Sequence, residues 1–270
     1  MDGKKRHDPF LDLSPELRAE LAKYYRQARL RDKREGIGHE AWVSQSRGWE
    51  EYCLRLGILQ EYAEALIENR ILTNEKCQLL DVGIGHGEAM AELSKKFGPK
   101  LKISGLRLSH RNITGVLQYQ ARVGPMEMLG FASYSMDFIF SVRGGFVYTL
   151  NSFRSLENAL NSLKVHGIAF LEDATLLLSK EWIVDFLTQR GFSADVARYE
   201  NGGPASLKII RDNLEPIDLS RFEKRYLLQI EANKEVFLRW GFDRMKKDTP
   251  LDEVFSGLYS KKHYQDLLEE

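Results

Sequence analysis

Three glycines at alternate positions follow a short apolar segment and precede a helical pattern. Residues 79–89 read LLDVGIGHGEA. The stretch from Cys77 to Val82, apolar apart from Gln78 and Asp81, predicts a strand buried on both faces of a parallel sheet. Glycines allow a sharp turn and a close approach to a ligand, and the free N–H groups of the following helix favour an anionic or carboxylate-bearing ligand. The segment predicts a ligand-binding strand–turn–helix unit.

The spacing of the glycines differs from the G-x-G-x-x-G of dinucleotide-binding proteins. With Asp81 two residues before Gly83, it resembles motif I of the class I S-adenosyl-L-methionine (SAM)-dependent methyltransferases. In that family the loop wraps the methionine end of SAM, and the acid helps to hold it through the loop or the ammonium group. A glycine-rich turn without a ligand is the alternative. The resemblance implies cofactor contacts at Asp81, Gly83, Ile84, Gly85 and Gly87.

Later segments resemble the motifs of this family in the same order. Residues 101–106 predict the second strand, and residues 136–141 resemble the fourth strand, F-D-x-I-x-S. Residues 164–173 resemble the L-K-P-G-G turn and fifth strand, with Val165 in place of proline and His166 in place of the first glycine. The resemblance covers about residues 76–211. It implies a Rossmann-like α/β domain with a seven-stranded, mostly parallel sheet and helices on both faces.

Two positions depart from the family pattern. The second strand of the family usually ends in an acid that accepts the ribose hydroxyls, but Arg107 stands here, and arginine only donates hydrogen bonds. Pro125 replaces the acid that holds the adenine amino group, and Glu127 lies two residues later. By position, Arg107, Leu108, Met126 and Glu127 are the predicted cofactor contacts in these segments.

The sequence does not assign catalytic residues. Methyl transfer from a sulfonium mainly requires in-line positioning and sometimes a general base. Ser141, at the end of the fourth strand, is a predicted cofactor contact. Arg143 and Tyr148 follow where the family usually places substrate-facing residues. His86 and Asp173 are further candidates near this edge, and no metal-binding motif is present, so no metal is predicted.

The flanking regions carry helical patterns. Ser14-Pro15-Glu16 is typical of a helix start. Residues 50–69 predict one helix, and residues 220–240 predict one long helix that ends at Gly241. On the first of these helices the expected inward-facing residues are Leu54, Ile58, Tyr62, Ala65 and Leu66.

These patterns predict three parts. Residues 1–75 form a helical N-terminal extension or cap, residues 76–211 form the methyltransferase-like domain, and residues 212–270 form a helical C-terminal extension. In small-molecule methyltransferases such flanks often cover the substrate pocket. We expect the two extensions to do so together.

Composition excludes several classes of protein. The chain has 39 basic and 39 acidic residues, so its zero net charge gives no general attraction to nucleic acid. No N-P-P-Y or D-P-P-Y motif of amino-methylating nucleic-acid enzymes occurs. Two cysteines, no apolar run of transmembrane length and no signal-like N-terminus favour a cytoplasmic protein that does not associate with membranes. Homo-oligomerisation stays open.

Three functions fit these observations. The first is a methyltransferase that uses SAM and acts on a small molecule. The second is a catalytically silent methyltransferase-like protein that binds a partner. The third is an NADP-dependent enzyme, because an arginine after the second strand can accommodate a 2′-phosphate; the glycine spacing disfavours it.

Overall fold

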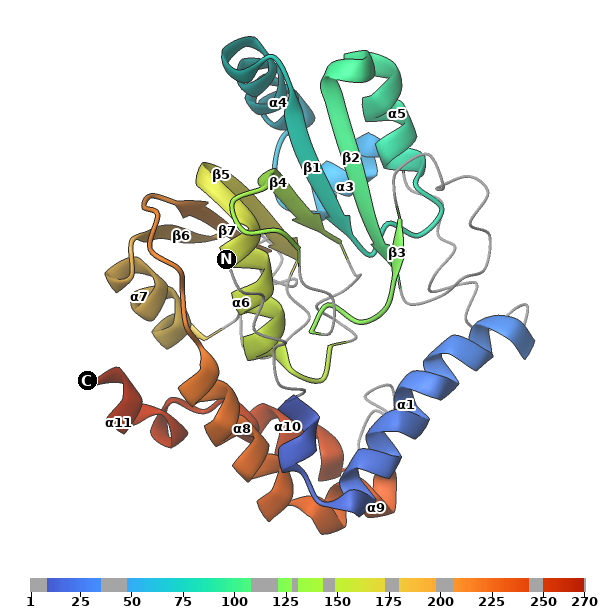
Figure 1. The fold of residues 1–270 in the computed structure, drawn as a ribbon, viewed down its shortest axis with the longest axis vertical. Helices are drawn as coiled ribbons and strands as arrows, with labels where there is room; N and C mark the ends of the chain where they lie inside the picture. Colours follow the sequence, from blue (N-terminus) through green and yellow to red (C-terminus); the bar gives the residue numbers. More distant parts are fainter. Residues whose placement is uncertain are drawn as a thin grey trace.

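The computed structural model describes residues 9–34, 48–107, 121–127, 131–142, 149–172, 180–197, 206–242 and 250–269. A seven-stranded sheet forms its centre, in the order β3-β2-β1-β4-β5-β7-β6 (Figure 1). The strands are β1 (Cys77–Val82), β2 (Leu101–Arg107), β3 (Arg122–Val123), β4 (Met136–Ser141), β5 (Leu163–Glu172), β6 (Phe192–Ala197) and β7 (Ser206–Arg211). The first five strands pair in parallel, and β7 runs antiparallel to both β5 and β6. The predicted mostly parallel sheet is confirmed, with β1 in its interior.

Helices cover both faces of the sheet. On one face the core includes α3 (Trp49–Arg55), α4 (Gln60–Asn74) and α5 (Glu88–Phe97), which is followed by η2 (Gly98–Lys100). On the other face the core includes α6 (Ser152–Ser162) and α7 (Glu181–Gln189). Each face therefore buries its own hydrophobic cluster, as expected for a parallel sheet.

The N-terminal and C-terminal helices pack against each other. They are η1 (Pro9–Asp12), α1 (Pro15–Arg34), α8 (Ser220–Ala232), α9 (Lys234–Trp240), α10 (Pro250–Leu258), η5 (Lys261–His263) and α11 (Gln265–Leu268). Contacts join α1 to α9 and η1 to α8, and the Ser14 backbone N–H donates to Glu231 Oε2 at 3.0 Å. Figure 1 shows α1, α8, α9 and α10 beyond the end of the sheet toward which β1 and β4 run. The described residues among the first 75 thus divide between this helical layer and the α3–α4 pair that covers the sheet.

Two helix predictions were wrong in the same way. Residues 50–69 do not form one helix, because the chain breaks near Gly57, where φ is 66°, and α4 starts afresh at Gln60. The break changes the phase of the buried stripe, so Leu54 is 67% exposed and Tyr62 is 41% exposed. Ala65 is exposed as well. Ile58 and Leu66 are half-buried and pack against the core as predicted, whereas the fully buried residues are Tyr52, Cys53, Leu56, Ala63, Ile67 and Ile71.

The predicted long helix over residues 220–240 is likewise two helices. They meet at Asn233, which ends α8 and precedes α9. The Asn233 side-chain Nδ2 donates to Gln229 O at 2.7 Å. This hydrogen bond occupies a carbonyl in the last turn of α8. Asparagine competes with the helical backbone for hydrogen bonds in this way. The predicted stop at Gly241 is confirmed, since α9 ends at Trp240.

An aromatic cluster joins the C-terminal helices to the sheet domain. The Phe153 ring on α6 lies 5.8 Å from Phe222 and 5.2 Å from Tyr264 between ring centroids. The Trp182 ring on α7 stacks on Tyr264 at 5.2 Å. Burial of large rings contributes several kcal/mol of hydrophobic stabilisation, roughly 1.5–3 kcal/mol each. These aromatic residues of the C-terminal region therefore form part of the core.

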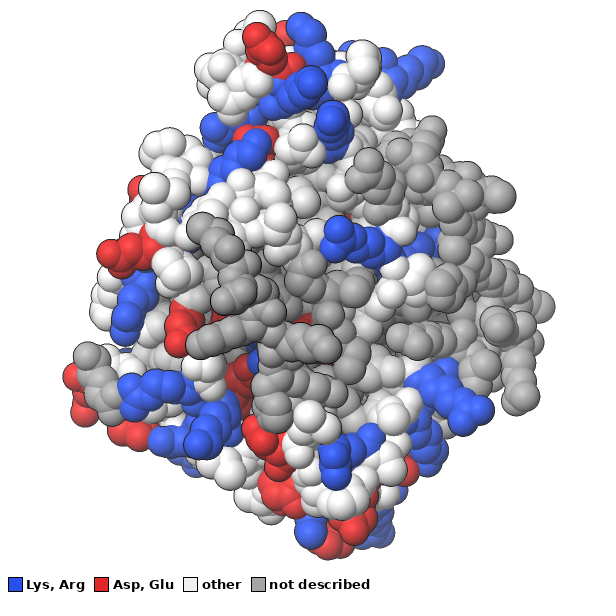
Figure 2. All heavy atoms as spheres, viewed as in Figure 1, with Lys and Arg blue, Asp and Glu red and all other residues white. Residues whose placement is uncertain are grey.

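Charged side chains of both signs are interspersed on the face shown in Figure 2. This distribution agrees with the zero net charge of the chain. Among the described residues, the helices are too short or too polar for any of them to cross a lipid bilayer.

Candidate functional site

The glycine turn lies at the carboxyl end of β1. Gly83, Gly85 and Gly87 have φ angles of 98°, 55° and 79°. Side chains with a Cβ rarely adopt this left-handed region, so the turn requires glycine at all three positions. α5 begins immediately afterwards at Glu88. Its first backbone N–H groups have no carbonyl partner within the helix and can bind an anionic group.

The position of this turn in the sheet favours ligand binding. The chain builds β2 and β3 on one side of β1, and then crosses to build β4 and β5 on the other side. In open parallel sheets, ligands bind beyond the carboxyl ends of the strands at such a switch point. The glycine turn therefore borders the crevice in which a ligand is expected.

The turn is fixed to the neighbouring strand β2. The backbone N–H groups of Gly83 and Ile84 both donate to Leu106 O, at 2.8 and 3.1 Å. The Ile84 side chain lies over Gly105, where an added Cβ would be 2.7 Å from Ile84 Cδ1. Ile84 therefore anchors the turn through packing, and glycine at position 105 makes room for it.

Asp81, the acid before the turn, accepts a hydrogen bond from a tyrosine on α3. Tyr52 Oη donates to Asp81 Oδ1 at 2.6 Å, and both residues are buried, at 6% and 2% exposure. A hydrogen bond to a carboxylate is shorter and stronger than one between neutral groups. It offsets part of the cost of removing the Asp81 charge from water.

Other contacts fix α3 in this position. The Trp49 ring stacks on Tyr52 with centroids 5.7 Å apart, and it meets the Phe140 ring of β4 edge-on at 5.6 Å. The Trp49 backbone N–H donates to Glu92 Oε2 on α5 at 2.9 Å. α3 thus bonds to Asp81 before the glycine turn and to Glu92 after it.

Arg107 ends β2 at the same edge of the sheet. The β1–β2 register pairs Val82 with Leu106, which places Arg107 beside Gly83. Its side chain is 5% exposed, and its backbone O accepts from the Gly124 N–H at 2.9 Å. The structure thus places an arginine where the family resemblance implies a ribose-binding acid.

Glu127 is surrounded by donors from the protein. Tyr25 Oη on α1 and the Leu150 backbone N–H donate to Glu127 Oε1, the latter at 3.1 Å. Thr149 Oγ1 donates to Oε2 at 2.7 Å, and Ser155 Oγ lies 3.5 Å from the same oxygen. Both carboxylate oxygens accept bonds, and the residue is 2% exposed. These contacts favour a structural role in joining α1 to the start of α6.

Met126 and Ser141 are buried near the same edge. Met126 is 1% exposed, and its carbonyl accepts from Asn158 Nδ2 at 3.1 Å. Ser141 is the last residue of β4 and is fully buried. Its Oγ has no hydrogen-bond partner within the described part of the chain. Buried polar atoms are nearly always satisfied, so this hydroxyl fits a group that a ligand would supply.

Several predicted residues lie outside the described ranges. They are Leu108, Arg143, Tyr148 and Asp173. The structure therefore brings together Asp81, the glycine turn, Arg107 and Ser141 at one edge, while the substrate contacts stay predictions.

The sequence reasoning missed Tyr52 and Tyr25. Trp49 and Tyr52 are three residues apart on a helix, a spacing that predicts a shared face. Nothing in that spacing indicates that the face meets Asp81, which lies 29 residues later. The Tyr25–Glu127 contact spans 102 residues and has no local signal either.

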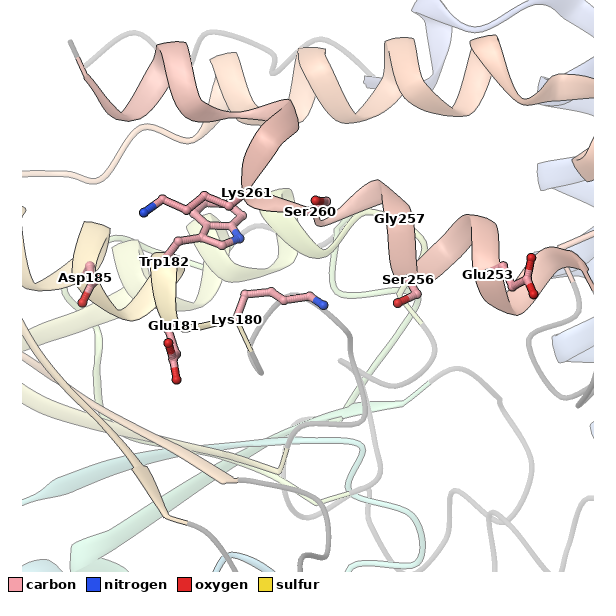
Figure 3. A pocket seen from close by; sticks show the side chains of 9 residues that line it. All are labelled: Lys180, Glu181, Trp182, Asp185, Glu253, Ser256, Gly257, Ser260 and Lys261. Carbon is pink, nitrogen blue, oxygen red and sulfur yellow. The ribbon is translucent and has the colours of Figure 1, made fainter.

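A cavity of about 870 Å³ opens between α7 and the C-terminal helices (Figure 3). Figure 3 shows Lys180 directed from the start of α7 toward Ser256 on α10. Glu181, Asp185 and Glu253 also line the cavity, so charges of both signs surround it. The described lining residues include none of the sequence-predicted site residues.

Neither metal nor thiol chemistry has support in the described residues. They contain no group of three His, Cys, Asp or Glu residues that could hold a metal ion. Burial, followed by the nearby Glu64 and Glu61 carboxylates, raises the pKa of the Cys53 thiol to about 12. Burial raises the pKa of Cys77 to about 12 as well. Both thiols are protonated at neutral pH, and Cys77 is the buried apolar residue that its strand position predicts.

Comparisons with known proteins concern the fold. No protein-family model and no curated protein sequence matches this chain. The plantazolicin methyltransferase BpumL, solved with a monoazolic desmethylPZN analogue and S-adenosylhomocysteine (SAH), is 12% identical, with a TM-score of 0.47 over 73% of this chain and 99% of that one. A protein described as a methyltransferase, in complex with the Haloferax volcanii Trm112 activator, is 17% identical, with a TM-score of 0.45 over 65% and 98%. The [4+2]-cyclase SpnF is 12% identical, with a TM-score of 0.40 over 78% and 77%. The strand order and register of this chain themselves define a Rossmann-like α/β fold of seven strands.

Proposed function

We propose that this protein is a SAM-dependent methyltransferase that acts on a small molecule. The observation that carries the proposal is the glycine turn, with three left-handed glycines at the carboxyl end of β1, beside the switch point of the sheet. A turn of this kind admits a ligand close to the backbone. The buried Asp81 carboxylate beside it attracts an ammonium group.

The residues present fit a nucleoside with an amino-acid tail. Asp81 and the turn Gly83–Gly87 would hold the methionine end of SAM, and the buried Met126 side chain offers an apolar contact to adenine. The buried Ser141 hydroxyl would gain its missing partner from the ligand. Arg107 would meet the ribose as a donor to its hydroxyl oxygens rather than as an acceptor. In this scheme the adenine amino group needs a partner other than Glu127.

SAM supplies a methyl group on a sulfonium, which a nucleophile on the substrate can attack directly. The contribution of the chain is then to hold donor and acceptor in line and to exclude water. The helices α1, α8, α9 and α10 lie beyond the carboxyl ends of the strands and would cover the reacting groups.

Calorimetric titration of the purified protein tests the proposal directly. We expect SAM and S-adenosylhomocysteine (SAH) to bind, and NADPH not to bind. Binding of NADPH alone would favour an NADP-dependent enzyme, with Arg107 at a 2′-phosphate. If none of the three binds, the site is not a SAM site and the proposal fails.

The second candidate is a catalytically silent binding protein with the same fold. The buried Arg107 at the position of the ribose acid and the capture of Glu127 by four protein groups favour it. Fold alone does not decide between the two functions. Release of SAH from SAM in the presence of candidate small-molecule acceptors, measured by mass spectrometry, would identify the enzyme.

A further inference from the structure

The hydrogen bond between Tyr52 and Asp81 connects α3 to the ligand edge of the sheet. Asp81 is the only charged residue of β1, and its partner comes from a helix 29 residues earlier in the chain. The bond length of 2.6 Å is typical of a hydroxyl that donates to an ionised carboxylate. A hydrogen bond to a carboxylate that is buried at the edge of the sheet where a ligand is expected can serve ligand binding as well as packing.

We propose that Tyr52 is a positioning residue that orients Asp81 and thereby selects ligands with a free amino group. The inference rests on the proposed function, because the amino group in question is that of the methionine end of SAM. A carboxylate can accept about four hydrogen bonds. The phenol occupies one position on Oδ1 and restricts the rotation of the carboxylate. The orientation of the carboxylate relative to the glycine turn is then fixed.

The tyrosine is itself rigidly held. Its ring stacks on Trp49 with an interplanar angle of 28° and meets Phe140 edge-on, with centroids 6.2 Å apart. The phenol oxygen cannot leave Asp81 without disturbing these rings, and rings packed in a core resist such movement. Tyr52 therefore acts as a fixed donor.

α3 bonds to the chain on both sides of the turn. The Trp49 N–H bonds Glu92 on α5, and a Cβ added at Gly48 would lie 3.0 Å from Glu92 Oε1. The helix thus spans from Asp81, before the turn, to the first part of α5, after it. The Tyr52 hydroxyl that orients Asp81 is therefore held in place by the contacts of α3 with β4 and α5.

The test compares two ligands that differ only in the amino group. They are SAH and S-adenosyl-4-thiobutyrate, which is SAH without its α-amino group. Each is titrated into the wild type and into Tyr52→Phe, which removes only the hydroxyl. We expect the Kd of SAH to rise about tenfold in Tyr52→Phe, in keeping with the loss of a charge-assisted hydrogen bond. The Kd of the thiobutyrate should change less than twofold.

Tyr62→Phe is the matched control. Tyr62 lies on α4, is 41% exposed, and bonds Lys208 Nζ through its hydroxyl at 2.9 Å. The variant loses a phenol hydroxyl that lies outside the site, so both ligands should bind to it with the same Kd as to the wild type. Trp49→Phe keeps the Tyr52 hydroxyl but loosens the ring stack. It should raise the Kd of SAH, but not that of the thiobutyrate, by less than Tyr52→Phe does. It provides the readout if Tyr52→Phe does not fold.

Equal weakening of both ligands in the site variants would assign Tyr52 a structural role only and overturn the inference. Unchanged SAH binding in Tyr52→Phe would do the same. In either case SAH still binds the wild type, so the proposed function survives. If the wild type binds neither ligand, the proposed function fails, and the inference fails with it.

Discussion

Gly85 and Gly98 both have a positive φ, of 55° and 61°, but only Gly85 lies in the glycine turn. An added Cβ at Gly98 meets nothing within 4 Å. Alanine at either position should strain the backbone, at a cost on the order of 1–3 kcal/mol. We expect Gly85→Ala to abolish or strongly reduce SAH binding and Gly98→Ala to leave it unchanged. Calorimetry measures the binding, and circular dichroism verifies the fold; unchanged affinity in Gly85→Ala would place the ligand elsewhere.

Arg107 is the residue that most clearly separates the possible ligands. If SAM is the natural ligand, Arg107→Asp restores an acceptor for the ribose hydroxyls and should tighten SAH binding, by up to about 1–3 kcal/mol. Arg107→Leu removes the guanidinium without adding an acceptor, so it should give no such gain. A loss of SAH affinity in Arg107→Asp, with the fold preserved, would show that the arginine takes an active part in binding.

At the scale of elements, the Tyr25–Glu127 bond attaches α1 to the sheet domain. Tyr25→Phe leaves a buried carboxylate short of one donor, which should lower the free energy of unfolding by about 1–3 kcal/mol. The double variant Tyr25→Phe with Glu127→Gln should lose less than the sum of the two single variants, because both remove the same interaction. Urea denaturation measures these values, with Tyr62→Phe as the surface control. Strict additivity would show that the two side chains are not coupled.

The sequence predicts elements well where the signal is local. The glycine turn requires its three glycines through backbone geometry alone, and β1 shows its burial in its composition. The break at Gly57 could not be predicted, because the apolar residues after it continue the helical spacing of those before it almost without interruption. Contacts such as Tyr52–Asp81 depend on which face of α3 meets the sheet, and that is decided by packing over the whole domain. His166 stands where the family pattern has glycine, and its φ of 59° is a backbone conformation that glycine adopts more readily than other residues.

At the scale of the whole molecule, the two buried cysteines report on global opening. Their thiol pKa values are raised to about 12, so the folded state binds the thiol proton more tightly than the unfolded state. The stability that the protonated, buried thiols contribute to the folded state is fully present below the ordinary thiol pKa, near 9. It is lost as the pH rises toward 12. We expect no reaction of either thiol with Ellman's reagent at pH 8 in the native protein, and reaction of both in urea. Rapid labelling of one thiol without urea would reveal local opening around α3 or β1.

The contact between the N-terminal and C-terminal helices also determines when α1 can be buried during synthesis. The hydrogen bond from Ser14, just before α1, to Glu231 on α8 can form only after a further 217 residues have been synthesised. At translation rates of roughly 5–20 residues per second, that interval lasts on the order of 10–40 s. Until then Leu17 and Leu21 on α1, which are buried in the finished protein, have no C-terminal helix to cover them. Until the C-terminal helices are synthesised, α1 therefore exposes an apolar stripe that a chaperone can bind.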